Sequence, residues 1–387
     1  MPIIVHIDMN SFFASCEVKR NPALKGKEII ISGKTNRSIV SAASYEAKKK
    51  GIYTTMPYFQ ARQLCPNAYF FVGDYDYYHA VSHEFFSFLK KRYSLVEIAS
   101  VDECYIEIQE TIQNPMEYFK SLQKEIYETI HIPCSIGVSY NKFLAKMASD
   151  YQKPMGITFI KKKDVPKIIW PQPIQNMYGI GKASAKKLID IQILTIGDLA
   201  NKEDYRIAEI LGSSYLSYLE HAQGKGISHI EVKEYLPKSV GHSHTLAFDS
   251  DDEEIIKKEL YPLCLHVADR LQKLNMIGYT ITLTLKDSEF VLKNKSKKMM
   301  VPTNDEDRIY IEAMKLLDHA LHFKIRLVGV SISDLIFPED YYQQLDIYHL
   351  NDIKMNKSAD LIERFNEIAG QKLFMKAKDA KGSHKHE

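Results

Sequence analysis

Three carboxylates in this 387-residue chain stand where strand-like segments end, and they are the residues most suited to chemistry. Asp8 follows the apolar run at residues 3–7, and Asp102 and Glu103 lie between two further strand-like segments. Carboxylates at strand ends suit Mg²⁺, and two such ions ~3.5–4 Å apart activate a hydroxyl group and stabilise a leaving phosphate. A site for metal-assisted phosphoryl transfer is therefore one interpretation, although for an arbitrary Asp-Glu pair in a loop the base rate favours a structural role. The alternative is a turn at Asp8 and a solvated hairpin tip at Asp102 and Glu103.

The elements that must position these carboxylates alternate between strands and helices, which indicates a mixed α/β unit closing near residue 165. Successive side chains of a strand point to opposite faces. Asp102 and Glu103 therefore reach one site only if a turn or bulge redirects one of them. The expected strands are 3–7, 95–99, 105–108 and 134–138, and the expected helices are 77–92, 114–130 and 141–149.

The rest of the chain divides into further units. We expect residues 25–57 to form a small insert. Residues 176–200 are expected to form two helices joined by a tight Gly-Ile-Gly turn. The polar stretch 223–238 is the best candidate for a linker. A separate α/β domain is expected beyond it, with strands at 279–285, 290–292 and 327–335 and helices at 254–274 and 305–322.

Composition excludes several classes of protein. The 51 Lys and Arg against 49 Asp and Glu leave a net charge of +2, which argues against indiscriminate coating of nucleic acid or anionic membranes. With 45% hydrophobic residues the chain is expected to be globular, and its length predicts two to four domains. No apolar run approaches the ~20 residues that span a bilayer, so we expect a cytoplasmic protein without a membrane partner. The five scattered Cys support neither disulfides nor a zinc site.

Five segments, in order and at plausible spacing, resemble the Y family of translesion DNA polymerases. With RLVGVSISDL near residue 330, the resemblance covers residues 3 to about 335. It implies a multidomain α/β right-hand polymerase: palm (1–18 and 76–165), small fingers (19–75), all-α helix-hairpin-helix thumb (166–234), linker (235–238), C-terminal α/β little finger (239–338) and tail (339–387). The segments are HIDMNSFFASCE, SYEAKKKGI, ASVDECYIEI, SIGVSYNKFLAKMASDYQKPMG and GIGKASAKKL.

The resemblance assigns roles to the carboxylates and to the residues around them. Asp8, Asp102 and Glu103 match the family's ligands for two Mg²⁺, with the carbonyl of Met9 as a further ligand, and they serve attack of a primer 3′-hydroxyl on the α-phosphorus of a dNTP. The resemblance assigns triphosphate contacts to three other residues, and one of them, Lys48, stands where Arg is usual. We therefore hypothesise weaker nucleotide binding, because Lys cannot form the bidentate hydrogen bonds of Arg. These residues are Tyr45, Lys48 and Lys153.

Two aromatic residues and two strand residues would shape the nucleotide site. Phe12 and Phe13 would more often be core in an arbitrary protein, but Phe13 matches the family's steric gate against a ribose 2′-hydroxyl. We expect Phe12 to be buried behind the nucleotide and Phe13 to face the sugar. Ile39 and Ser41 match the roof over the templating base, with plain strand alternation as the alternative.

DNA contacts are expected at two places. Gly179, Gly181 and Lys182 resemble the turn of a helix-hairpin-helix, whose backbone N–H groups bind phosphate without reading sequence. A lysine cluster in the last domain is the other candidate, with a solvated surface as the alternative. Between residues 140 and 167 there are seven Lys against two Asp, so basic charge is segregated despite the small total. The cluster comprises Lys293, Lys295 and Lys297.

The tail carries a peptide that resembles the sliding-clamp motif of bacterial polymerases, with Gln344, Leu345, Ile347 and Tyr348 as its anchors. The leading interpretation is a monomeric, low-fidelity polymerase of the polymerase IV type, acting on primer-template DNA with dNTPs and the clamp. Alternatives are a polymerase V-like mutagenesis subunit that needs partners, a catalytically silent DNA- and clamp-binding module, and a two-metal nuclease or nucleotide cyclase. The intact carboxylates disfavour the silent module.

Overall fold

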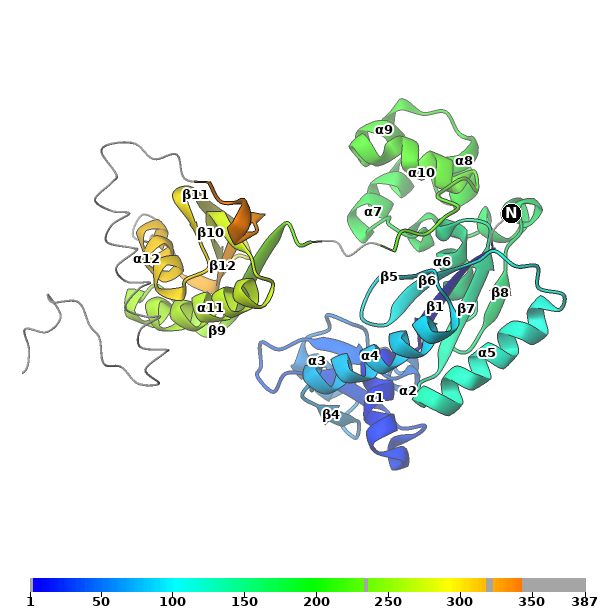
Figure 1. The fold of residues 1–387 in the computed structure, drawn as a ribbon, viewed down its shortest axis with the longest axis horizontal. Coiled ribbons are helices and arrows are strands. Elements are labelled where there is room, and N and C mark those ends of the chain that lie inside the picture. Colours follow the sequence, from blue (N-terminus) through cyan, green and yellow to red (C-terminus); the bar gives the residue numbers. More distant parts are fainter. Residues whose placement is uncertain (1–2, 233–235, 318–322, 343–387) are drawn as a thin grey trace, which may run out of the picture. The chain divides into compact units, whose positions relative to one another are not determined.

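The computed structural model describes residues 3–232, 236–317 and 323–342. The chain forms two compact units, Met1–Tyr235 and Leu236–Glu387 (Figure 1). Each unit buries its own apolar core around its own sheet. Within the described ranges, no helix is both long and apolar enough to cross a membrane.

A five-stranded sheet in the order β5-β6-β1-β7-β8 forms the centre of the first unit. Strand β1 lies in the middle and pairs antiparallel with both β6 and β7. Its apolar sequence is buried from the second residue onward, as expected for a strand covered on both faces. The strands are β1 (Ile3–Met9), β5 (Val96–Ile98), β6 (Glu103–Ile108), β7 (Cys134–Ser139) and β8 (Ile157–Phe159).

Helices cover both faces of this sheet. Helices α4 (Tyr75–Arg92) and α5 (Pro115–Ile130) pack with α1 (Phe12–Arg20) around the face that carries Val5 and Ile7. Helix α6 (Lys142–Tyr151) lies on the opposite face, where Ile4 and Ala145 share a cluster. It lies so close to β7 that a Cβ on Gly137 would be 2.0 Å from the carbonyl oxygen of Ala145. Glycine at this position therefore lets α6 approach the sheet.

A small subdomain is inserted between α1 and α4. Its sheet has the order β3-β2-β4, with β2 antiparallel to β3 and parallel to β4. Two helices complete it around a separate core that includes Ile30, Val40 and Ala61. Its elements are β2 (Ile29–Ser32), β3 (Val40–Ala43), β4 (Tyr69–Phe71), α2 (Tyr45–Lys49) and α3 (Tyr58–Leu64).

Four short helices follow the large sheet and share a core with α6. The helix expected before the Gly-Ile-Gly turn is only the single 3₁₀ turn Ile174–Asn176. Pro173 precedes that turn and Gly179, with φ +92°, follows it closely, so few residues are left for an α-helix. The helices are α7 (Lys182–Asp190), α8 (Ile196–Asn201), α9 (Tyr205–Leu211) and α10 (Tyr215–Ala222).

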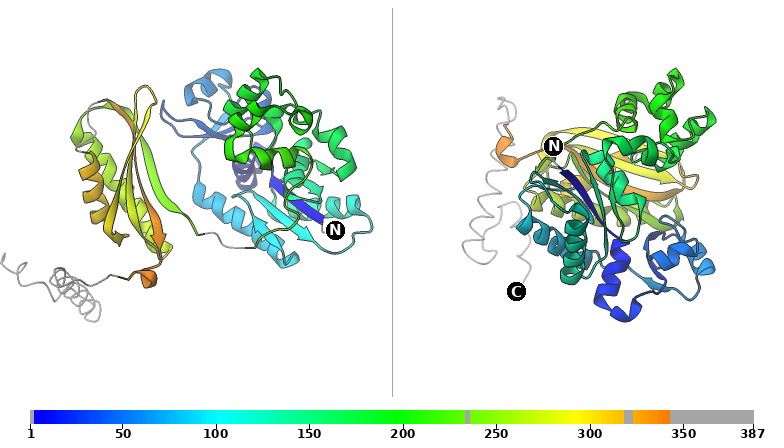
Figure 2. Two further views of the ribbon diagram at one scale, coloured as in Figure 1. Left: turned by 90° about the horizontal axis from the view of Figure 1, so that it is seen from above. Right: turned by 90° about the vertical axis from the view of Figure 1, so that its right-hand side faces the viewer.

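The second unit is an antiparallel sheet in the order β11-β10-β12-β9, with both helices on one face (Figure 2, left). Alternate residues of β10, such as Ile281 and Leu283, pack against α11 residues such as Leu260. The elements are β9 (Ser239–Ser250), α11 (Glu253–Lys273), β10 (Ile277–Asp287), β11 (Leu292–Thr303), α12 (Glu306–Leu317) and β12 (Ile325–Ile336). The expected strand at 290–292 was wrong in extent, because the lysine-rich segment itself forms β11.

Candidate active site

The three predicted carboxylates line one cavity of about 290 Å³ in the first unit. The register of β1 and β6 pairs Asp8 directly with Glu103, and directly paired residues point to the same face of a sheet. Asp102 belongs to the turn before β6, where its carbonyl accepts a hydrogen bond from the Met9 N–H at 3.0 Å. Ser100 donates to the Asp102 carboxylate at 2.7 Å. The turn thus resolves how adjacent Asp102 and Glu103 reach one site.

Two lysines lie among these carboxylates. The Lys146 ammonium is 2.5 Å from Glu103 Oε1, 3.3 Å from Asp8 Oδ2 and 3.5 Å from Asp150 Oδ2, and the residue is only 6% exposed. The Lys153 ammonium is 2.6 Å from Asp8 Oδ2. Sequence reasoning identified Lys153 but missed Lys146, whose position depends on the contact between α6 and the sheet.

The electrostatics of the cavity favour added positive charge. Burial, together with a hydrogen bond to Glu103, raises the pKa of Asp8 to about 7, despite the opposing lysines. Burial also raises the pKa of Asp102. Burial acts in the same direction on Glu103, but its contacts with His6, Asp8 and Lys146 outweigh it and hold the pKa of Glu103 well below its usual range. Desolvation therefore disfavours the ionised forms of Asp8 and Asp102, and a cation bound beside these carboxyl groups would favour those forms.

This donor set suits divalent cations, since three carboxylates and the main chain of Met9 border the same space. In the described part of the chain, no three acidic, His or Cys side chains are already gathered as a metal site. The ammonium groups of Lys146 and Lys153 contact the oxygens that a metal would use. The residues therefore fit Mg²⁺ if the ions displace these contacts.

A buried histidine lies behind Glu103. His6 Nε2 is 3.7 Å from Glu103 Oε2 and has no hydrogen-bond partner, while Nδ1 is 2.8 Å from Ser149 Oγ. Burial lowers the pKa of His6, so the neutral ring is favoured at pH 7. Sequence reasoning missed His6, since a single His in an apolar strand carries no signal of its own.

The two phenylalanines differ in their surroundings. Phe12 is 3% exposed, whereas Phe13 is half-buried, and both border the cavity. The Phe13 ring stacks on Tyr78 with centroids 4.7 Å apart and an interplanar angle of 17°, and Tyr75 meets it edge-on. The stack on Tyr78 holds the Phe13 ring in a defined orientation at the cavity.

The predicted triphosphate residues also border the cavity. Ser44 caps α2, which carries Tyr45 and Lys48. The Lys48 ammonium donates to Ser11 Oγ at 3.0 Å and lies 4.8 Å from the centre of the Tyr45 ring. Burial lowers the pKa of Lys48. Of the predicted roof residues, Ser41 borders the cavity, whereas Ile39 is 50% exposed and does not line it.

The helix-hairpin-helix candidates lie at the start of α7. The carbonyl of Gly179 accepts a hydrogen bond from the Tyr218 hydroxyl at 2.8 Å. Gly181 is the N-cap residue of α7, and Lys182 is its first helical residue. A helix start of this kind presents free backbone N–H groups.

The lysine cluster of the second unit does not lie on the open face of its sheet. Register pairs Lys293, Lys295 and Lys297 with Leu285, Leu283 and Ile281, whose side chains face the helices. Lys297 forms an ion pair with Glu312 of α12 at 2.7 Å, and the Lys293 ammonium is 3.5 Å from the centre of the Phe323 ring. The open face carries the hydroxyl side chains of Thr280, Thr282, Thr284, Ser331 and Ser333, together with Lys298, which pairs with Thr280. Gln344, Leu345, Ile347 and Tyr348 lie outside the described residues.

Comparison with known proteins agrees with this arrangement. Residues 7–150 match the impB/mucB/samB family, 162–193 match the IMS family HHH motif, and 237–347 match the impB/mucB/samB family C-terminal domain. DNA polymerase IV 1 of Bacillus subtilis is 37% identical over 383 residues, covering 97% of this chain and 92% of that protein. DNA polymerase IV of Oceanobacillus iheyensis is 36% identical over 394 residues, covering 100% and 94%.

Solved structures give the same result. The Y-family DNA polymerase chimera Dbh-Dpo4(243-245)-Dbh has a TM-score of 0.78 at 28% identity, covering 87% of this chain and 99% of that one. The insertion ternary complex of Dbh DNA polymerase has a TM-score of 0.60 with the same identity and coverage. The large sheet, the helix-hairpin-helix motif and the second unit thus correspond to palm, thumb motif and little finger. The chain belongs to the impB/mucB/samB family, the Y family of DNA polymerases.

Proposed function

We propose that this chain is a template-directed DNA polymerase of the polymerase IV type, which extends a primer 3′-hydroxyl with dNTPs at low fidelity and copies past lesions. The observation that carries the proposal is the single cavity bordered by Asp8, Asp102 and Glu103 together with Phe13 and Lys48. The names of the relatives support the polymerase activity.

Asp8, Asp102, Glu103 and the carbonyl of Met9 would hold two Mg²⁺. When bound, the ions would supply charge neutralisation and activation of the primer hydroxyl. The cationic side chains of Lys48 and Lys153 and the hydroxyl of Tyr45 bind and orient the triphosphate. Phe13 excludes a ribose by its shape, and Phe12 supports it from the core.

The remaining residues serve the other partners. The backbone N–H groups at Gly179, Gly181 and Lys182 bind DNA phosphates, so that binding is independent of sequence. The peptide containing Leu345 and Tyr348 docks on the sliding clamp. Polymerase IV-like relatives favour a chain that acts alone over a polymerase V-like subunit that needs partners.

Primer extension by the purified chain tests the proposal. With Mg²⁺ and single dNTPs, we expect template-directed addition on undamaged and lesion-bearing templates, and Glu103→Ala should abolish it. Extension that Glu103→Ala leaves intact would refute the assignment of the site. DNA binding without any extension would favour the silent module, and extension that requires added subunits would favour the polymerase V-like alternative.

A further inference from the structure

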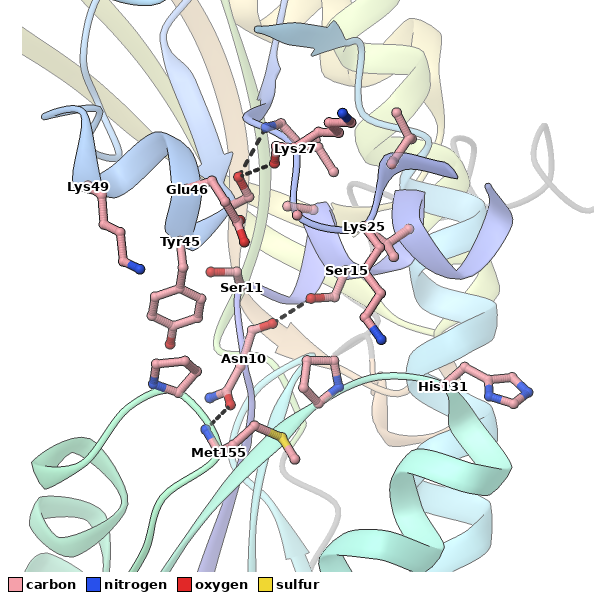
Figure 3. A pocket seen from close by; sticks show the side chains of 18 of the residues that line it. Asn10, Ser11, Ser15, Lys25, Lys27, Tyr45, Glu46, Lys49, His131 and Met155 are labelled. Carbon is pink, nitrogen blue, oxygen red and sulfur yellow. Dashed lines mark hydrogen bonds between the residues drawn. The ribbon is translucent and has the colours of Figure 1, made fainter. Parts of the chain in front are cut away.

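A second cavity, of about 510 Å³, adjoins the nucleotide site (Figure 3). Its walls come from α1, the loop before β2, the start of α2, the end of α5 and the loop after Lys153. Ser11 and Tyr45 line both cavities. Of the residues that line this second cavity, only Tyr45 has a role in the proposed function.

The chemistry of the walls is that of a small-molecule site. Apolar side chains predominate, among them Ala14, Val18, Leu24 and Ile29, and the volume lies within the range of ligand pockets. Apolar walls of this size accommodate a hydrocarbon or aromatic body.

The charged residues that line the cavity are mainly cationic. Lys25, Lys27 and Lys49 line the cavity against one carboxylate, that of Glu46. None of the three lysines forms an ion pair with a described residue, and the Lys25 ammonium lies 3.5 Å from the Tyr127 hydroxyl and 5.9 Å from the centre of the Tyr127 ring. Unpaired ammonium groups around apolar walls are complementary to an anion with an apolar body.

The walls are continuous with the residues proposed to bind the triphosphate. Ser11 accepts the hydrogen bond of Lys48, and Tyr45 lies beneath the same ammonium group. Across the cavity, Met155 follows closely after Lys153, and its N–H donates to Asn10 Oδ1 at 2.8 Å. A ligand here would contact Ser11, Tyr45 and Met155 at once (Figure 3).

We propose that this cavity binds a small organic anion with an apolar body, and that its occupancy changes the affinity of the neighbouring site for the incoming nucleotide. A ligand that contacts Ser11 and Tyr45 changes how these two residues meet the nucleotide, and the coupling acts in both directions. The coupling rests on the proposed function, whereas the binding site does not.

Titration of the full-length chain with anilinonaphthalene sulfonate, an aromatic anion, tests the site by fluorescence. We expect saturable binding at one site. Lys25→Glu combined with Lys27→Glu should weaken it about tenfold, since favourable charge becomes repulsive. Val18→Trp should abolish it by filling the cavity. The exposed pair Lys90→Glu and Lys91→Glu on α4, which does not line the cavity, is the matched control and should bind normally.

Unchanged probe affinity in both the charge variant and a natively folded Val18→Trp variant would overturn the site. Simple competition between probe and dNTP would also overturn it, because the probe would then occupy the nucleotide site. For the coupling, the apparent dissociation constant for dNTP in single-turnover extension should shift with bound probe in the wild type and not in Val18→Trp. If the chain extends no primer, the proposed function fails while the probe titration still decides the site.

Discussion

Lys146 is the residue whose environment says most about the active site. Its ammonium group contacts Asp8 and Glu103 and is almost fully buried. Two carboxylates that face each other across β1 and β6 would repel one another without a cation between them. Lys146 therefore supplies the positive charge that holds the acids together when Mg²⁺ is absent.

Lys146→Met should make the stability of the first unit depend on Mg²⁺. Removing one partner of a buried charge cluster costs about 3 kcal/mol of unfolding free energy. Added Mg²⁺ should recover much of that loss, because bound metal replaces the missing charge. Thermal unfolding with and without Mg²⁺ measures the effect. Lys142 lies on the same helix as Lys146 and forms an ion pair with Glu97 of β5, so Lys142→Met is the matched control. An equal response to Mg²⁺ in both variants would contradict the role of Lys146.

Phe13→Ala should admit ribonucleotides, because the stack on Tyr78 holds the ring at the cavity. We expect the ratio of dNTP to rNTP incorporation to fall by at least about a hundredfold, or roughly 3 kcal/mol of lost discrimination. Competing single-nucleotide extension measures it. Tyr75→Ala removes the edge contact from the same aromatic group and should keep the discrimination. Unchanged selectivity in Phe13→Ala would move the gate to another residue.

The sequence predicted which carboxylates lie together better than it predicted the charges around them. Asp8, Asp102 and Glu103 stand in short local motifs, and strand pairing then brings them to one cavity. Lys146 could not be found this way, since its burial depends on α6 approaching β7 at Gly137. Motifs predict which residues meet, but charge balance depends on packing between distant segments.

At the scale of elements, strands with few buried residues escaped prediction. Strand β9 buries only Val240, Leu246 and Ser250, so its sequence of Ser, His and Gly shows no apolar alternation. Strand β11, at the edge of the sheet, was predicted only in part because its lysines also interrupt the apolar pattern of a strand. Edge strands need charge to avoid pairing with other chains, which gives these lysines a structural role beside any contact with DNA.

The two glycines of the Gly-Ile-Gly turn differ, because Gly179 is required by the fold whereas Gly181 is proposed to contact DNA. Gly179 has φ +92°, and a Cβ there would lie 3.0 Å from the Tyr218 ring, so Gly179→Ala should cost roughly 1–2 kcal/mol of stability. A Cβ at Gly181 would meet no atom within 4 Å.

Gly181→Ala should therefore leave the free energy of unfolding nearly unchanged and still weaken DNA binding, because a methyl group would obstruct a phosphate approaching the start of α7. Urea denaturation and fluorescence anisotropy with primer-template DNA measure the two effects. If Gly181→Ala binds DNA as tightly as the wild type, the start of α7 does not contact phosphate.

For the whole molecule, the net charge of +2 limits non-specific attraction to DNA. Basic residues gather in segments such as 140–167, where seven Lys stand against two Asp. A few clusters of this kind would offer only a few phosphate contacts. We therefore expect weak retention of DNA by the chain alone.

An enzyme with weak retention needs another means of staying on its template, and the peptide from Gln344 to Tyr348 would provide it by tethering the polymerase to the clamp. Leu345→Ala combined with Tyr348→Ala should reduce clamp-stimulated product length about tenfold or more, and clamp-free extension should remain unchanged. Running-start extension with and without loaded clamp measures both. Leu361→Ala combined with Phe365→Ala alters the same tail outside the peptide and should keep the stimulation. Full stimulation of the Leu345 and Tyr348 variant would show that the clamp, if used, is bound elsewhere.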